Sequence, residues 1–557
     1  MQSFPRFMEV LFTVAIGSAL ASAQMPMPMP MPSADNRPVT LVAGLGDAHH
    51  IIRTTSPRAQ KFFDQGMNFL WAFNHDEARR SFQKAADLDP TAAMPLWGVA
   101  LAVGPNYNDI DIGHAREQQA FDAINKAKQL AAGGPAIEAD YVDALAARYA
   151  EDTHHDLKVQ GERYAKAMEA LVAKHPDDLD AATLYAESLM DLHPWQLWTA
   201  DGKPVAGTET ILATLQSVIL RDPNHVGANH FYIHAVEASP DPSVALASAE
   251  RLKTLAPAAG HLVHMPAHIY QRVGNFEGSA DANQHAIAAD EAYVKAEHLN
   301  GVANMYDTMY LTHNIHFLAA ACMMEGRAEC AIDAANRLVA HVEPEVPTNK
   351  GIEWYLPTQP WVLTRFERWD DIVKVPASPS DLFVLGSMWH YARGAAFTAL
   401  KQPEKAAAER KALADAMQNL PKDISPDFNN SAKSVFELSL TALDARMAEA
   451  NGNREQAITL WKKAVALLDT FAYNEPADWY YPVRESLGGA LLRNNQAAEA
   501  EIVFRRDLEL NPNSGRSLYG LWQSLLMQHR DSDAALVKAQ FEAAWAHADF
   551  KLTIADL

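Results

Sequence analysis

A 34-residue repetition constrains the fold of this chain more than any other feature of its sequence. His230 and His234 are four residues apart, as are His264 and His268, and each member of the second pair follows its counterpart by 34 residues. Residues four apart lie on one face of an α-helix. A fixed period of this length indicates helical hairpins that stack side by side. We therefore expect the two histidine pairs to occupy equivalent places in neighbouring repeats.

Small residues and prolines mark such hairpins along most of the chain. Near the start, the small residues would let two antiparallel helices approach and the proline would end the second helix. These residues are Gly66, Ala78, Phe82, Ala85 and Pro90. Related spacings recur at Gly488, Ala500, Phe504 and Pro512, at Gly394 and Ala406, and at Ala319 and Ala331. The pattern closely resembles the tetratricopeptide repeat (TPR) family. The resemblance implies an all-α, TPR-type solenoid, a superhelix of antiparallel helix hairpins.

Four short motifs carry a second resemblance. They are AFNHDEA at residues 72–78, GANHFYIHAVEASP at 227–240, GHLVHMPAHIYQRVG at 260–274 and HNIHF at 313–317. The chain is similar to a group of bacterial exported TPR proteins in which these motifs recur. The resemblance implies the repeat fold and export from the cytoplasm. It implies no particular reaction.

The first residues predict a cleaved secretory signal peptide over residues 1–23. An apolar run at 10–20 precedes Ala21, Ser22 and Ala23, which are typical of a cleavage site. That run is too short to span a bilayer, and no later segment reaches about 18 uncharged apolar residues. We therefore expect a periplasmic or secreted protein with no membrane span.

The remaining chain divides into three segments. Residues 24–56 begin with alternating Met and Pro and predict a flexible, extended tail and lead-in. Residues 57–300 predict an N-terminal TPR array that carries the histidine cluster, and residues 301–557 predict a C-terminal array continuous with it. Cys322 and Cys330 would stand at the end of one helix and the start of the next. A disulfide and two buried thiols are both compatible with this placement.

The charge of the chain excludes one class of partner. Its formal net charge is −22, and no cluster of Lys and Arg interrupts this acidic character. A phosphate backbone would be repelled, so nucleic acid is not expected as a partner.

The repeat register predicts which surface the histidines occupy. In the TPR family, positions 2, 5, 9 and 12 of each first helix line the concave groove. When the repeats begin at Val226, Gly260 and Thr312, histidines from all three first helices fall on these positions. They are His230, His234, His261, His264, His268, His313 and His316. Glu237 falls on position 12 of the first of these repeats.

Histidines aligned on adjacent helices can bind a transition metal ion. Packed helices lie about 8–10 Å apart, and imidazole nitrogens bind an ion at about 2.0–2.1 Å. Nitrogen ligands suit Cu, Zn or Fe, and the sequence does not choose among them. Glu237 is a candidate ligand, outer partner or general base. The same histidines are also compatible with a surface for an anionic or aromatic ligand, and with simple packing.

Two functions therefore follow from the sequence. In the first, an exported TPR protein binds a transition metal ion in a histidine-lined concave groove and supports catalysis on a small molecule, as a metal-dependent oxidoreductase or hydrolase. In the second, a non-catalytic TPR scaffold binds a peptide or protein partner in the periplasm. The fold favours the second by analogy, because these repeats mostly bind partners. The aligned histidines favour the first.

Overall fold

The computed structural model of the protein describes residues 37–149, 156–299, 306–375, 382–422, 424 and 430–557. In these ranges the chain forms helices, turns and loops, with no β-strand. The α-helices up to residue 296 are α1 (Pro57–Trp71), α2 (His75–Leu88), α3 (Met94–Val103), α4 (Gly113–Ala131), α5 (Ala136–Ala146), α6 (Leu157–Lys174), α7 (Leu179–Met190), α8 (Thr208–Arg221), α9 (Val226–Val236), α10 (Leu246–Leu255), α11 (Gly260–His264), α12 (Pro266–Val273) and α13 (Phe276–Ala296).

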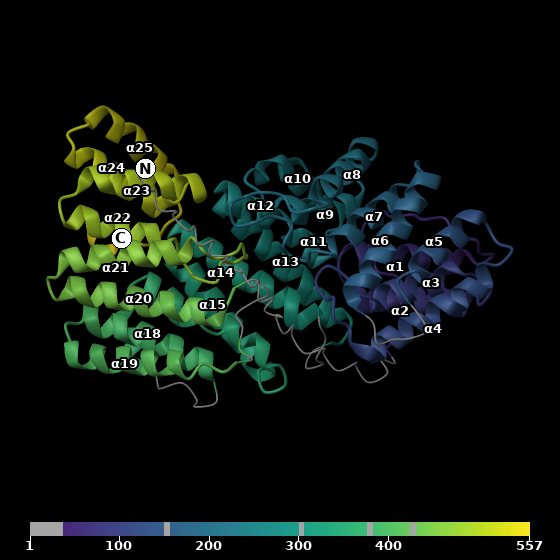
Figure 1. Ribbon diagram of the computed structural model, residues 1–557, viewed down its shortest axis with the longest axis horizontal. Coiled ribbons are helices and arrows are strands. Elements are labelled where there is room, and N and C mark those ends of the chain that lie inside the picture. The colour runs from purple at the N-terminus through teal and green to yellow at the C-terminus, as the bar shows by residue number, and fades with distance from the viewer. Residues whose placement is uncertain (1–36, 150–155, 300–305, 376–381, 423, 425–429) are drawn as a thin grey trace, which may run out of the picture.

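The α-helices that follow are α14 (Thr312–Glu325), α15 (Ala328–Val342), α16 (Thr358–Arg365), α17 (Trp369–Lys374), α18 (Phe383–Ala399), α19 (Pro403–Gln418), α20 (Ala432–Ala450), α21 (Arg454–Leu468), α22 (Val483–Arg493), α23 (Ala497–Leu510), α24 (Gly515–Met527) and α25 (Asp531–Ala544). Short 3₁₀ helices span Pro242–Ala245, Glu343–Glu345, Lys350–Tyr355 and Ile554–Asp556, and a π-helical turn spans Tyr306–Leu311. Consecutive helices pack against each other as hairpins and stack into two curved arrays (Figure 1). The predicted all-α, TPR-type solenoid is confirmed.

The packing around Phe82 shows why the repeat pattern requires small residues. The Phe82 ring, on α2, is fully buried between Gly66 on α1 and Gly98 on α3. A Cβ atom on Gly66 would overlap the edge of this ring, and a Cβ on Gly98 would lie 2.5 Å from its Cδ1 atom. Phe504 on α23 lies in the same way between Gly488 and Gly520. One aromatic ring thus joins three successive helices at glycines.

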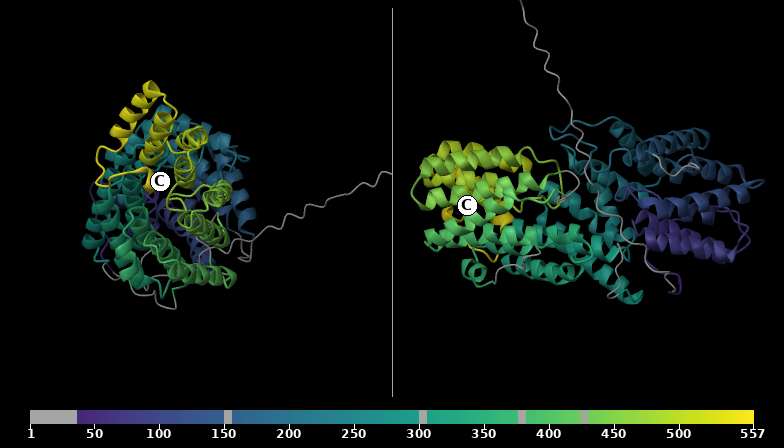
Figure 2. Two further views of the ribbon diagram at one scale, coloured as in Figure 1. Left: turned by 90° about the vertical axis from the view of Figure 1, so that its left-hand side faces the viewer. Right: turned by 60° about the horizontal axis from the view of Figure 1, so that its bottom comes forward.

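The buried apolar side chains form two large clusters. The first runs from Leu45 to Tyr270 and the second from Ala280 to Leu557. Helices α9 and α11–α13 lie in the middle of the molecule, between the array at one end that contains α1–α7 and the array at the other that contains α18–α25 (Figures 1 and 2). The histidine-bearing part of the chain therefore lies where the two apolar clusters meet.

The described part of the N-terminal lead-in packs on the first hairpin. A guanidinium nitrogen of Arg37 lies 2.9 Å from Oε1 of Glu77 on α2. The backbone amides of Val42 and Ala48 donate to side chains of α1 at 2.8 and 3.3 Å. Residues 37–56 are thus anchored to the solenoid. The predicted signal peptide at 1–23 and the Met-Pro run that follows it lie outside the described residues.

A disulfide joins Cys322 at the end of α14 to Cys330 at the start of α15. It crosslinks one helical hairpin and selects one of the two states that the sequence left open. Within the described ranges, no helix is both long and apolar enough to cross a membrane.

Replacing Gly66 with Ala should destabilise the fold. Ala normally stabilises a helix interior relative to Gly by about 1 kcal/mol, but here the new Cβ meets a ring that Gly98 prevents from moving away. Overpacking of this kind costs about 1–3 kcal/mol, so the apparent midpoint of thermal unfolding should fall. Gly351→Ala is the control, because a Cβ atom added there would have its nearest neighbour, Oδ1 of Asn349, at 3.4 Å. Equal midpoints for the two variants would contradict this account.

Candidate metal centre

The histidine cluster is built from four helices. His230 and His234 lie on α9, whose residues are all buried. His261 and His264 lie on α11, and His268 follows on α12 after the short break at Pro266. The fourth helix, α14, adds His313. Because α9, α11 and α12 present these side chains to one another, their imidazole rings converge at the centre of the molecule.

The cluster is enclosed, which differs from the predicted open groove. His230, His234, His261, His264 and His268 are at most 3% exposed, and His313 is half-buried. The sequence placed these residues correctly on one stripe of the first helices. It did not show that aromatic side chains and a loop from the C-terminal array cover that stripe.

Six histidines form two groups of three. In each group the candidate ligand atoms all lie within 4.8 Å of one another. We call His230, His234 and His261 the N-terminal triad, and His264, His268 and His313 the C-terminal triad. The seventh predicted ligand, His316, belongs to neither. Its ring instead packs edge-on against Tyr355, 5.4 Å away between ring centroids.

In the N-terminal triad, the protein backbone orients one imidazole. Nδ1 of His230 lies 2.7 Å from the carbonyl oxygen of Trp71, to which it donates. Nε2 of His230 is therefore a lone-pair atom, and it lies 3.1 Å from Nε2 of His261. Neither Nε2 of His234 nor Nδ1 of His261 has a hydrogen-bond partner among the described residues.

In the C-terminal triad, polar side chains orient two of the imidazole rings. Nδ1 of His264 donates to Oδ1 of Asn283 at 2.7 Å, and the Asn283 amide group donates to the carbonyl of Ser279, which fixes its orientation. Nδ1 of His268 lies 2.8 Å from Oε2 of Glu475. The two Nε2 atoms then face each other at 2.8 Å. With both Nδ1 atoms acting as donors, two lone pairs meet unless a proton or a cation lies between them.

Two buried carboxylates support the cluster from outside. Oε1 of Glu237 lies 3.1 Å from Nδ1 of His234, and its Oε2 lies 2.8 Å from Nδ1 of His268. Glu237 therefore contacts one histidine of each triad. Glu475 reaches His268 from the loop between α21 and α22, 207 residues further along the chain. Carboxylates that accept the outer N–H of a histidine are typical partners of metal-binding imidazoles.

The pKa of His268 is shifted in the opposite direction from the pKa values of the other five histidines of the two triads. Burial lowers the pKa of His268, but Glu237 and Glu475 outweigh it and raise the pKa to about 10. Burial also raises the pKa of Glu237, while the charges of His268 and His234 outweigh it and bring the pKa to about 2. For His230, His234, His261, His264 and His313, burial lowers the pKa, and neighbouring histidines add to this. These five imidazoles are held in the neutral form, which is the form that binds metals.

Aromatic side chains exclude water from the cluster. The Phe73 ring stacks on His234 and His261, at centroid distances of 5.7 and 5.4 Å. Tyr310 covers His261 at 4.6 Å, and Phe317 lies 5.0 Å from both His264 and His268. Low polarity around the cluster strengthens every electrostatic interaction inside it.

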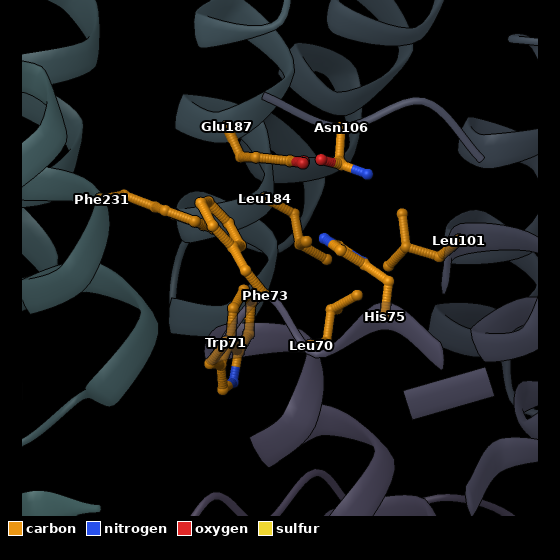
Figure 3. A pocket seen from close by; sticks show the side chains of 9 residues that line it. All are labelled: Leu70, Trp71, Phe73, His75, Leu101, Asn106, Leu184, Glu187 and Phe231. Atoms are coloured by element: carbon orange, nitrogen blue, oxygen red, sulfur yellow. The ribbon is translucent and has the colours of Figure 1, made fainter. Parts of the chain in front are cut away.

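Phe73 also lines a small cavity (Figure 3). Its walls are Leu70, Trp71, Phe73, His75, Leu101, Asn106, Leu184, Glu187 and Phe231. In Figure 3 the Glu187 carboxylate and the Asn106 side chain point toward each other. Neither ring nitrogen of His75 has a partner among the described residues. Burial lowers the pKa of His75 to about 3 and raises that of Glu187 well above its usual value. The cavity is thus mostly apolar and its polar groups are uncharged, and nothing in the sequence analysis had indicated it.

A third group of metal-binding residue types, His50, Asp178 and Asp180, has a structural role. The two carboxylate oxygens of Asp180 contact His50 Nδ1 at 2.7 Å and His225 Nε2 at 3.2 Å. Nδ1 of His225 accepts from the backbone amide of Ala228 and so caps α9. Here each of these nitrogens already has a partner outside the group of imidazoles, whereas the inward Nε2 atoms of His230, His261, His264 and His268 face only one another.

Sequence reasoning identified the histidines but only one of their partners. Glu237 was predicted as a ligand, an outer partner or a general base, and its two oxygens contact two Nδ1 atoms, as an outer partner does. Phe73, Asn283 and Glu475 were missed. The only signal in the sequence that pointed to Phe73 was its place within the AFNHDEA motif, directly before the asparagine. Glu475 lies far from the histidines in sequence and in no recognised motif.

Comparisons with known proteins add little to this site. No family model matches the chain, and no curated protein matches it. Among solved structures, a human IFIT1 dimer with m7Gppp-AAAA aligns at 14% identity over 89% of this chain and 92% of the other, with a TM-score of 0.33. A human IFIT1 dimer with PPP-AAAA aligns at 13% identity over 88% and 91%, with the same TM-score. These scores are too low to support an argument about this chain.

Replacing Glu237 with Gln should destabilise the metal-free protein in a pH-dependent way. The folded pKa of His268 is about 10, above its ordinary 6.5, so its pairing stabilises fully below pH 6.5 and is lost as the pH rises toward 10. The pKa of Glu237 is lowered from 4.5 to about 2, so its contribution is present above pH 4.5 and is lost as the pH falls. The loss of unfolding free energy should therefore be largest near pH 5–6, at about 3 kcal/mol, and smaller at pH 10.

Denaturant unfolding of chelator-treated protein at pH 6 and pH 9.5 measures this effect. Glu485→Gln is the matched control, because Glu485 is equally buried and pairs with Arg365, whose charge does not change in this range. Its loss of stability should be similar at both pH values. A Glu237→Gln effect that is also constant would contradict the pairing with a charged His268.

Proposed function

We propose that this chain is an exported TPR-type protein whose histidine cluster binds a transition metal ion. One observation carries the proposal. The Nδ1 atoms of His230, His264 and His268 are held by outer acceptors, while their Nε2 atoms converge in pairs at 3.1 and 2.8 Å with His261 and with each other. This is the arrangement of metal-binding imidazoles, in which the outer N–H fixes the ring and the inner nitrogen binds.

The main competing explanation is packing, and the chemistry of the residues argues against it. A buried polar atom without a partner costs free energy. Apolar residues of similar size would fill the same space without leaving Nε2 of His234 and Nδ1 of His261 unpartnered. Six histidines gathered in one water-poor site therefore cost free energy if they only fill space. As metal ligands, their nitrogens gain the partners that packing alone does not give them.

The enclosure of the cluster decides what it can act on. A peptide or protein cannot reach imidazoles that are at most 3% exposed, so the histidines do not form a partner-binding surface. Ligation by three histidines leaves a coordination position for water or a small molecule. We therefore favour a metal centre for a small substrate, as an oxidoreductase or hydrolase, over a peptide scaffold. Glu237 acts as a positioning residue in this proposal, because both of its oxygens contact imidazole nitrogens.

Cu, Zn and Fe remain the candidate ions. The inward donor atoms are imidazole nitrogens, with no thiolate among them, because the two cysteines of the chain are joined to each other. Nitrogen donors suit these three metals and disfavour Mg and Ca, which prefer oxygen. The periplasmic or secreted location is part of the same proposal and rests on the signal-peptide pattern of residues 1–23.

Metal analysis tests the proposal directly. Protein purified without a His-tag should contain near-stoichiometric metal by inductively coupled plasma mass spectrometry, and the His230→Ala/His264→Ala double variant should contain little. His316→Ala is the control, because it removes a histidine of α14 that lies outside both triads. Wild-type protein that is metal-free and refuses added Cu, Zn and Fe would overturn the proposal.

Metal removal should lower the thermal stability. An ion that binds only the folded state stabilises it by about 2.7 kcal/mol at a free concentration 100 times its dissociation constant. Chelator-treated wild type should therefore unfold at a lower temperature and recover when the ion is restored. His316→Ala should show the same recovery, while the double variant should show none. A recovery in the double variant would place the stabilising ion elsewhere.

A further inference from the structure

We infer that the histidine cluster is a dinuclear centre, with one metal ion held by the N-terminal triad and a second by the C-terminal triad. This inference rests on the proposed function, since it concerns how many ions the same site takes. It goes beyond that function because a single ion would already satisfy it.

The first argument is the number and grouping of the ligands. Tetrahedral sites for Zn and similar ions take four protein or water ligands, so six imidazoles exceed the needs of one ion. The six divide into two sets of three that share no member, and within each set the ligand atoms lie within 4.8 Å of one another.

The second argument is the distance between nitrogens. Two nitrogens that bind one tetrahedral ion at about 2.0–2.1 Å lie roughly 3.3–3.4 Å apart. His230 and His261 have Nε2 atoms 3.1 Å apart, and His264 and His268 have Nε2 atoms 2.8 Å apart. Each close pair belongs to a different triad. The cluster therefore contains two separate points of convergence, and each close pair needs a shift of only a few tenths of an ångström to accept an ion, with the third nitrogen of its triad within 4.8 Å.

The third argument is the adjacency of the triads. The ring centroids of His234 and His268 are 5.7 Å apart, and those of His261 and His264 are 6.0 Å apart. These contacts cross from one triad to the other. Two-metal sites in proteins hold their ions about 3.5–4 Å apart, and neighbouring ligand sets in ring contact are compatible with such a separation.

Glu237 links the two triads from outside. One of its oxygens contacts Nδ1 of His234 in the N-terminal triad and the other contacts Nδ1 of His268 in the C-terminal triad. A single carboxylate thus orients one ligand of each ion. This shared support explains why a buried carboxylate lies beside the boundary of the two groups.

The charges of the residues around the histidine cluster indicate which pairs of metal ions it can hold. The six imidazoles bring no charge when neutral, so Glu237 and Glu475 supply the two negative charges in contact with the cluster when both are ionised. A buried site is stable when its charges are compensated. Two Cu(I) ions would be balanced by these two carboxylates alone. Two divalent ions would require further anionic ligands, which the coordination position left open in each triad can accept.

Metal stoichiometry of the full-length protein tests the inference. Chelator-treated wild type is titrated with Zn(II), and anaerobically with Cu(I), followed by removal of loose metal and elemental analysis. We expect two ions per chain with at least one of these probes. No bound ion with either probe would overturn the proposed function itself. One ion at most with both would overturn the dinuclear centre and leave the proposed function standing.

Single variants assign the ions to the triads. His261→Asn removes one ligand of the N-terminal triad, and His313→Asn removes one ligand of the C-terminal triad. Each variant should retain one ion, and His316→Asn should retain two. Loss of all metal from both single variants would show a single shared site and overturn the inference. Circular dichroism checks that the variants are folded, and the wild-type stoichiometry decides the question even if one variant does not fold.

Discussion

Each buried imidazole brings two nitrogen atoms that need partners, and this requirement organises the centre of the molecule. The surrounding chain provides partners for the outer nitrogens of His230, His234, His264 and His268 through the Trp71 carbonyl, Glu237, Asn283 and Glu475. Each outer hydrogen bond fixes the tautomer and the direction of a ring. The inner nitrogens are then turned toward one another in a space that aromatic side chains close to water. His268, which Glu237 and Glu475 keep protonated in the metal-free protein, can then donate from Nε2 to Nε2 of His264, and a metal ion that binds the C-terminal triad must replace that proton.

The two arrays meet around this cluster and depend on each other there. Arg272 at the end of α12 donates to the carbonyl of Glu237 and lies over the ring of Tyr473, 5.1 Å from its centroid. Asn513 donates to the carbonyl of Gly274, which ends α12. The contact with Tyr473 holds the loop that carries Glu475 near α12, and the contact of Asn513 joins the end of α12 to the turn between α23 and α24. The C-terminal array thereby completes a site whose ligands come mostly from the N-terminal one.

Much of the fold could be predicted from the sequence, because repeats are local. The spacing of Gly66, Phe82 and Pro90 reports contacts within one hairpin and its neighbour, and the 34-residue offset places His230 and His264 in register. The enclosure of the cluster could not be predicted. It depends on how small rotations between repeats add up along the superhelix, and on Glu475 reaching His268 across 207 residues. His316 shows the limit of register alone, since its ring packs against Tyr355 and joins neither triad.

The position of Glu475 has a consequence for maturation. A chain synthesised from its N-terminus completes the N-terminal triad and its Trp71 support as soon as residue 261 has folded. The C-terminal triad is still short of His313 at that stage, and His268 lacks one of its two carboxylates until the loop before α22 exists. The cluster therefore closes only once this loop has been made, and a chain truncated before the loop leaves His268 with Glu237 alone. Completion of the site is in this sense a check on the integrity of the chain as far as α22.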